Sequence, residues 1–204
     1  MSDLAEVVTL KSGAVLVREG DPAPYVFSIS SGSLKVYKLL PDGRRQITGF
    51  LFAGDFLGLA IGDDYVFSAE AMEPSVICRF RKGPFRLLVK QSPSLEHILL
   101  HRTMHELAAA QNQMLLLGRK TAIERLAYFL LDLPGRDPAR PSAPGQVRLQ
   151  MKRAEIADHL GLTIETVSRV LTRMKLNGLI STRSPHELVV ERPDRMRQHA
   201  LGEV

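Results

Sequence analysis

The sequence predicts an α+β chain in which a β-rich half is followed by a long helix and a winged helix-turn-helix. Three observations support this fold class. Short runs of β-branched and aromatic residues, separated by Gly and Asp turns, occupy much of residues 14–80. A helical pattern without interior proline or glycine follows over 93–117. Two short amphipathic helices joined at a glycine then lie within 151–174.

The N-terminal half has the pattern of short strands in a barrel or sandwich, because turn signals recur about every ten residues. The expected strands are 14–17, 25–30, 34–40, 46–52, 67–71 and 76–80. Pro84 opens a short helical segment, and Ser92-Pro93 predicts a helix with proline at its first position.

The helix over 93–117 has an apolar stripe that is longer than a local core could cover. A stripe of this length favours a partner helix, so we expect dimerisation. The residues of the stripe are Leu100, Met104, Leu107, Met114 and Leu115.

A second helix, 121–133, and a Pro- and Gly-rich loop, 134–145, lead to the helix-turn-helix. Gly161 supplies the turn and Thr163 is placed to cap the second helix. Two strands, 179–182 and 187–190, are expected to form a wing. The predicted domains are 1–92 for the β-rich domain, 93–118 for the dimerisation helix and 119–204 for the winged helix-turn-helix.

The second helix of the motif is expected to read DNA in the major groove. Glu165, Ser168 and Arg169 recur at helical spacing and project together, away from the apolar stripe of the helix. A guanidinium can bind guanine O6 and N7, and a carboxylate can accept from a cytosine amino group. Other expected DNA contacts are Thr163 and Thr166 at the start of the helix and Arg173 and Lys175 beside the phosphates.

Composition and charge agree with a nucleic-acid-binding protein that works in the cytoplasm. Residues 1–118 carry 12 Lys+Arg and 12 Asp+Glu, whereas residues 119–204 carry 15 basic and 10 acidic residues. The net charge of +5 therefore lies in the helix-turn-helix half, as phosphate binding requires. We expect no signal peptide and no membrane span. A single cysteine, Cys78, excludes an internal disulfide and a multi-cysteine zinc site.

The order of these elements resembles the CRP/FNR family of bacterial transcription regulators over nearly the whole chain. The segment 160–169, Leu-Gly-Leu-Thr-Ile-Glu-Thr-Val-Ser-Arg, is similar to the FNR/FixK branch, as are 46–50, 54–58 and 67–71. The resemblance implies a β-roll (a double-stranded β-helix like that of cyclic-nucleotide-binding domains) and a homodimer that reads a TTGAT…ATCAA-like palindrome. It also implies contact with RNA polymerase as an activator, although a repressor with the same DNA contacts stays open.

The effector of such a regulator is less apparent from the sequence. By resemblance, cyclic-AMP-binding members hold the ribose and phosphate with a Glu and an Arg, where this chain has Leu59 and Phe67. An unpartnered buried phosphate is strongly unfavourable, so we expect no cyclic nucleotide. Oxygen-sensing members hold a [4Fe–4S] cluster with four cysteines, and Cys78 resembles only the internal ligand. The expectation is therefore a FixK-like regulator without a cofactor.

Three alternatives stay open. Cys78 is interpreted as a small buried residue on a strand, but it could be a redox switch or the remnant of a cluster in a truncated iron–sulfur regulator. His97, His101 and His105 form an i, i+4, i+8 row, interpreted as polar residues flanking a dimer seam rather than as a metal site. A haem-based gas sensor would use one of them as an axial ligand. An enzyme is not expected, since residues 1–96 contain no histidine for a cupin-type metal site.

Overall fold

A computed structural model describes residues 5–59, 62–139 and 143–203. The chain divides into two units, Met1–Leu40 with Thr48–Met114 and Pro41–Ile47 with Leu115–Val204. Residues 140–142 of the expected loop lie outside the described residues.

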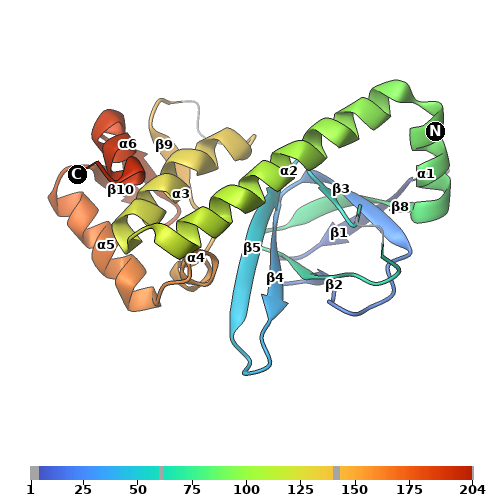
Figure 1. Cartoon of the computed structure of the whole chain (residues 1–204), viewed down its shortest axis with the longest axis horizontal. Coiled ribbons are helices and arrows are strands. Elements are labelled where there is room, and N and C mark those ends of the chain that lie inside the picture. Colours follow the sequence, from blue (N-terminus) through green and yellow to red (C-terminus); the bar gives the residue numbers. More distant parts are fainter. Residues whose placement is uncertain (1–4, 60–61, 140–142, 204) are drawn as a thin grey trace. The chain divides into compact units, whose positions relative to one another are not determined.

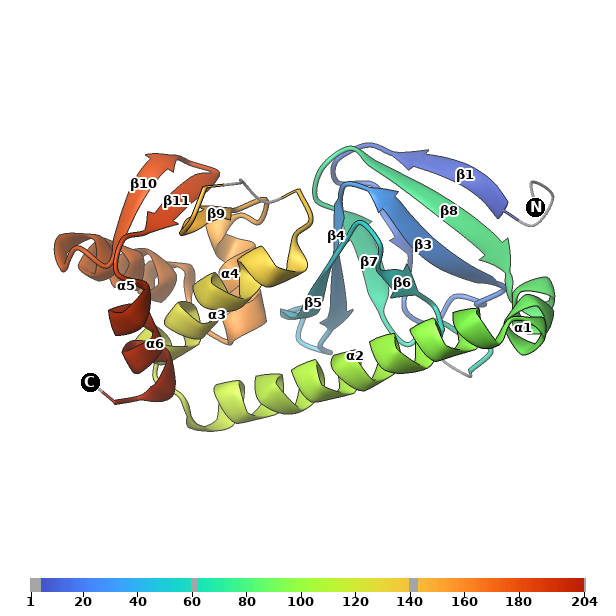
Figure 2. The ribbon, with the colours of Figure 1, turned by 90° about the horizontal axis from the view of Figure 1, so that it is seen from above.

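The β-rich part consists of two four-stranded antiparallel sheets, with strand orders β1-β8-β3-β6 and β2-β7-β4-β5. Figures 1 and 2 show β1, β8 and β3 side by side in the first sheet. This is the predicted β-roll. The strands are β1 (Ala5–Leu10), β2 (Val15–Val17), β3 (Tyr25–Ser31), β4 (Ser33–Leu39), β5 (Arg45–Phe52), β6 (Phe56–Leu57), β7 (Ser68–Ala71) and β8 (Ser75–Arg81).

The core of the roll forms where the sheets turn alternate side chains toward each other. Phe27 and Ile29 of β3, Leu34 of β4 and Ile77 of β8 are among the residues of this cluster. Gly32 makes the turn between β3 and β4 with φ of +87°, and a Cβ there would lie 2.8 Å from the Pro74 carbonyl oxygen. That position therefore requires glycine.

Two strands of the roll are absent from the sequence prediction. β1 pairs with β8 over six residues from Ala5↔Phe80 to Leu10↔Ser75, and β6 pairs with β3 through Phe27↔Leu57 and Ser28↔Phe56. β6 is two residues long, too short for an alternation pattern, and both are edge strands whose pairing partners are distant in sequence.

Two helices follow β8, α1 (Lys82–Gln91) and α2 (Pro93–Arg119). Pro93 is the first residue of α2, as predicted, and the Glu96 N–H donates to the Ser92 carbonyl at 3.0 Å. Phe85 of α1 and Leu99 of α2 pack with Val26 of β3 in a second apolar cluster.

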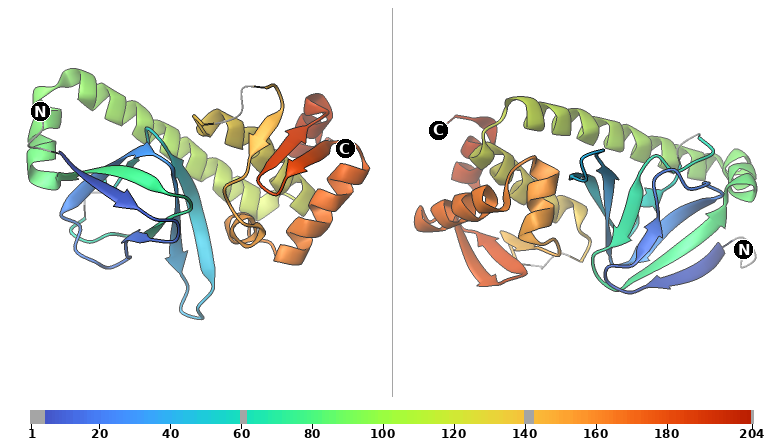
Figure 3. Two further views of the ribbon diagram at one scale, coloured as in Figure 1. Left: turned by 180° about the vertical axis from the view of Figure 1, so that it is seen from behind. Right: turned by 90° about the horizontal axis from the view of Figure 1, so that it is seen from below.

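The second unit contains a helix-turn-helix and a three-stranded sheet with the order β10-β11-β9 (Figure 3). Its elements are α3 (Ala122–Arg136), β9 (Gln146–Arg148), α4 (Arg153–Leu160), α5 (Ile164–Leu176), β10 (Ile180–Ser184), β11 (Glu187–Val190) and α6 (Pro193–Leu201). Buried side chains of α3, α4 and α5, such as Leu126, Ile156 and Met174, form its core. Arg125 of α3 donates to the Leu160 carbonyl at the end of α4 at 2.9 Å, which places a cation where helix carbonyls are unpaired.

The structure corrects the sequence prediction at three places in this unit. α3 includes Pro134 and ends at Arg136, so the predicted loop begins later than residue 134. β9, which completes the wing sheet, and α6 were not predicted. Among the described residues, no helix has both the length and the apolar character needed to cross a membrane.

Candidate nucleic-acid interface

The helix-turn-helix consists of α4, a glycine turn and α5. Gly161 adopts φ of 62° and ψ of 42° at the end of α4, a left-handed conformation that favours glycine. The Thr163 hydroxyl accepts a hydrogen bond from the Thr166 N–H at 3.2 Å, so Thr163 caps α5 as predicted.

One face of α5 is buried and the opposite face is exposed. Val167, Leu171 and Met174 pack inward. Glu165 and Arg169 lie on the exposed face, together with Thr172, which sequence reasoning missed. Residues 165, 169 and 172 lie within about 60° of one another around the helix axis, at 100° per residue. Thr172 follows Glu165 by seven residues, or about two helical turns, and this spacing is the signal that could have identified it from the sequence.

Two of the predicted contacts lie away from the centre of this exposed face. The Thr166 hydroxyl accepts a hydrogen bond from Arg169 Nη2 at 3.2 Å, and Thr166 itself is half-buried. Thr166 therefore positions the guanidinium of Arg169. Ser168 is exposed, and its carbonyl accepts from the Thr172 hydroxyl at 3.0 Å.

Glu165 is fully exposed and lies in the first turn of α5. A hydrogen bond from its own backbone N–H and one from the Thr163 side chain hold its pKa below its usual range. The carboxylate therefore stays ionised at neutral pH and can accept a hydrogen bond but cannot donate one.

Arg173 and Lys175 are exposed on opposite flanks of the α5 face. Each lies about 80° from Glu165 around the helix axis. Two cations flanking a central Glu–Arg pair suit a helix that lies between two phosphate backbones. The wing adds Arg183 on β10, which lies 4.0 Å from Glu187 of β11.

The apolar stripe of α2 is exposed in the isolated chain. Leu100, Met104, Leu107, Met114 and Leu115 are each more than half exposed. Leu99, about 100° from Leu100 around the helix axis, is buried.

Cys78 lies on β8 and is only partly buried, which corrects the expectation of a buried cysteine. Because neighbouring residues of a strand face opposite sides, the burial of Ile77 in the core turns Cys78 to the other face. Its Sγ lies 3.3 Å from the Ser30 Oγ.

Leu59 and Phe67 provide no polar partner for a phosphate. Leu59 is 38% exposed, whereas Phe67 packs against the core of the roll beside the Tyr65 ring, 6.4 Å away between centroids. A partly buried phenyl ring and an aliphatic side chain do not fit the ribose and phosphate of a cyclic nucleotide.

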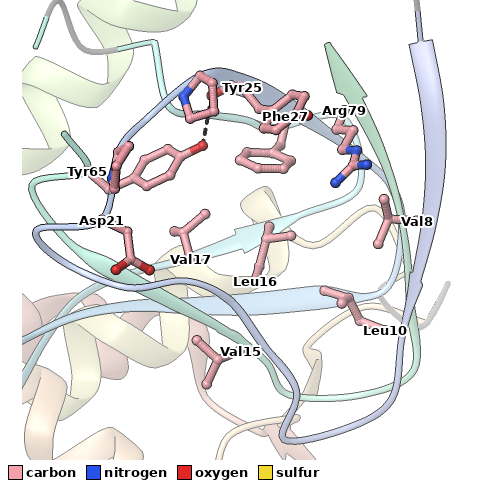
Figure 4. Close-up of a pocket in the computed structure, with 12 residues that line it drawn as sticks. Val8, Leu10, Val15, Leu16, Val17, Asp21, Tyr25, Phe27, Tyr65 and Arg79 are labelled. Carbon is pink, nitrogen blue, oxygen red and sulfur yellow. Dashed lines mark hydrogen bonds between the residues drawn. The ribbon is translucent and has the colours of Figure 1, made fainter. Parts of the chain in front are cut away.

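A mostly apolar pocket of about 350 Å³ lies elsewhere in the roll, between β1, β2 and β3 (Figure 4). Tyr65 donates a hydrogen bond from its hydroxyl to the Tyr25 carbonyl at 3.2 Å. Arg79 lies over the Tyr25 ring at 4.7 Å and pairs with Glu6 at 2.7 Å, so its charge is already matched.

His97, His101 and His105 are all exposed on α2. The rings of His101 and His105 lie edge to face with centroids 4.5 Å apart. Within the described part of one chain, no three His, Cys, Asp or Glu side chains lie together as a metal site would need.

Comparisons with known proteins agree with this architecture. Residues 7–92 match the cyclic nucleotide-binding domain, and residues 124–199 match the Crp-like helix-turn-helix domain. The nitrogen fixation regulation protein FixK of Bradyrhizobium diazoefficiens is 41% identical over 178 residues, 87% of this chain and 75% of FixK. The transcriptional activatory protein AadR of Rhodopseudomonas palustris is 43% identical over 177 residues, 87% of this chain and 74% of AadR.

Solved structures show the same fold. The structure of FixK2 from Bradyrhizobium japonicum superposes with a TM-score of 0.87 at 34% sequence identity, and the match covers 96% of each chain. The same family is indicated by the fold and by these relatives. The fold combines a β-roll with a helix-turn-helix that has an exposed Glu–Arg face. The chain belongs to the CRP/FNR family, in its FNR/FixK-like branch, and is a DNA-binding transcription regulator.

Proposed function

We propose that this regulator binds a TTGAT…ATCAA-like palindrome as a homodimer, and that α5 of each copy reads one half-site. The observation that carries the proposal is the exposed face of α5, where Glu165 and Arg169 lie side by side opposite the buried residues. An ionised carboxylate repels phosphate but accepts a hydrogen bond from a cytosine amino group, and Arg169 can grip guanine.

The dimer follows from α2, whose exposed apolar residues recur at alternating spacings of four and three. Leu100, Met104 and Leu107 form one heptad pattern, which Gln111 and Met114 continue. A polar residue at an a position restricts the register of such a pair, and we propose that the two α2 helices run parallel and in register. A two-fold dimer of this kind presents two α5 helices to a palindrome with half-sites about 34 Å apart.

The regulator binds DNA without a cyclic nucleotide and without an iron–sulfur cluster. Leu59 and Phe67 leave a phosphate without a polar partner, and Arg79 is already paired with Glu6. Cys78 offers one thiolate where a [4Fe–4S] cluster takes about four. The regulator acts as an activator that contacts RNA polymerase. Its relative AadR is a transcriptional activatory protein, which supports the activator role.

A pair of substitutions tests the base contacts. Arg169→Ala should weaken binding to the palindrome by about 1–3 kcal/mol per half-site and reduce discrimination against a mismatched half-site. Lys175→Ala is the matched control, because loss of a phosphate contact should weaken binding to all sequences alike and lower the salt slope by about one. Fluorescence anisotropy on both DNA sequences measures these changes. Unchanged discrimination in Arg169→Ala would remove α5 from base recognition.

A second measurement tests the effector. Aerobically purified protein should bind the palindrome unaided, and added cyclic AMP should change the affinity less than about tenfold, or about 1.4 kcal/mol of coupling. The same limit applies after anaerobic reconstitution with iron and sulfide. A larger gain in either experiment would identify the effector and contradict this part of the proposal.

A further inference from the structure

We propose that the dimer carries a pair of equivalent sites for a zinc-class divalent ion, each built from His101 and His105 of one copy and Glu96 of the second copy. The inference rests on the proposed α2 dimer and adds a ligand that the DNA-binding function does not require. Its starting point is the ring contact between His101 and His105 on an exposed helix face.

The histidine pair has the spacing and geometry of two ligands to one ion. His101 and His105 are four residues apart, so both rings project from the same side of α2. Their centroids lie 4.5 Å apart with the ring planes at 61°. Two nitrogens that bind one tetrahedral ion at about 2.0–2.1 Å lie about 3.3 Å apart, which small side-chain rotations allow here.

The heptad position of each histidine decides whether the pair stays accessible in the dimer. With Met104 and Gln111 at the a positions and Leu100 and Leu107 at the d positions, His101 occupies an e position beside the seam. His105 occupies a b position on the solvent side. The pair therefore stays open to solvent while it borders the second helix.

One chain supplies only two of the ligands. No third metal-binding side chain joins the pair among the described residues of a single chain. Glu96 is five residues before His101, about 140° away around the helix axis, and cannot reach the same ion within its own copy.

The second copy supplies the third ligand. Glu96 occupies a g position, and in a parallel in-register pair of helices each g residue faces the e residue five positions later on the other helix. Glu96 of one copy therefore faces His101 of the other. Two imidazole nitrogens and one carboxylate oxygen, completed by water, form a ligand set that suits Zn²⁺.

Zinc titration of the full-length dimer, in competition with a zinc-binding dye, tests the site. We expect one Zn²⁺ per chain in the wild type. His105→Ala and Glu96→Gln should each weaken the affinity at least tenfold. His97→Gln is the matched control, because His97 lies on the same helix at a seam position outside the site, and should retain wild-type affinity. Wild-type affinity in His105→Ala or Glu96→Gln would overturn the proposal.

Mixed dimers test whether the ligands come from two copies. A chain with His101→Ala and His105→Ala keeps Glu96, and a Glu96→Gln chain keeps the histidine pair. Neither should bind zinc tightly alone, but dimers re-formed from an equal mixture should regain tight binding at one site per mixed dimer. Absence of recovery in dimers shown to be mixed would overturn the shared site.

The same samples separate this proposal from the dimer on which it rests. A monomeric wild type in sedimentation would contradict the proposed dimer, and with it the shared site. If the wild type is a stable dimer and Glu96→Gln leaves its zinc affinity unchanged, the metal site alone is contradicted. The proposed DNA-binding dimer would then stand.

Discussion

Individual side chains in this regulator have roles that depend on what surrounds them. Glu165 and Arg169 are exposed, and their roles come from the direction in which α5 presents them. His159 of α4 is instead buried, with its Nδ1 3.1 Å from the Ile47 carbonyl oxygen and its ring beside Phe129. Because the carbonyl can only accept, the proton lies on Nδ1 of the neutral ring.

His159 makes the stability of the second unit depend on pH. Burial lowers the pKa of His159 from 6.5 to about 4, and the hydrogen bond to Ile47 only partly opposes this effect. The neutral ring contributes fully above pH 6.5, and this contribution is lost as the pH falls from 6.5 toward 4, because the unfolded state then binds the proton. Between pH 7 and pH 5 the loss should be about 2 kcal/mol.

His159→Asn tests this prediction, because asparagine keeps a hydrogen-bond donor but does not titrate. The free energy of unfolding, measured by urea denaturation at pH 7 and pH 5, should fall less for the variant than for the wild type. Equal losses in the two proteins would assign the acid sensitivity to other groups.

The elements of the second unit are joined by short connections whose conformation is set by single residues. Gly161 ends α4 with a left-handed backbone, and Thr163 caps the start of α5 two residues later. A Cβ at residue 161 would also lie 3.2 Å from Leu117 Cδ2. This turn fixes the direction in which α5 leaves α4.

Gly161→Ala should destabilise the second unit by about 1–2 kcal/mol, because alanine is strained in the left-handed conformation. Gly135→Ala is the matched control, since Gly135 lies in α3 without a positive φ and with nothing within 4 Å of its Cβ position. That variant should be neutral or slightly more stable. Thermal unfolding of both variants checks the difference, and equal stabilities would show that the turn tolerates a side chain.

In the molecule as a whole, the apolar stripe of α2 is a surface that a single chain leaves exposed to solvent. α2 has 27 residues, about 40 Å of helix, and the apolar side chains of this stripe are each more than half exposed. The proposed dimer covers this stripe and brings two recognition helices to one palindrome.

Leu107→Glu should therefore yield monomers, because it places two like charges opposite each other in the apolar seam. Palindrome binding should weaken with it, since one helix-turn-helix reads a single half-site. Leu201→Glu is the matched control: Leu201 is equally exposed, at 66% against 60% for Leu107, but lies on α6. Analytical ultracentrifugation distinguishes the outcomes, and an intact dimer in Leu107→Glu would remove α2 from the interface.

Local patterns in the sequence were sufficient for the fold class, the helix-turn-helix and the direction of its Glu–Arg pair. Helical periodicity, strand alternation and turn chemistry act over a few residues, so they can be followed along the chain. The cap at Thr163 and the start of α2 at Pro93 were predicted for this reason.

Features that depend on residues distant in sequence appeared only in the tertiary structure. The edge strands β1 and β6 form because their partners β8 and β3 lie beside them. Cys78 is half-exposed because its neighbour Ile77 is buried in the core, which turns Cys78 to the other face of the strand. His159 is neutral because it is buried against the Ile47 carbonyl, more than a hundred residues earlier in the chain. Burial and long-range pairing are set by how the whole chain packs, and no short stretch of sequence contains that information.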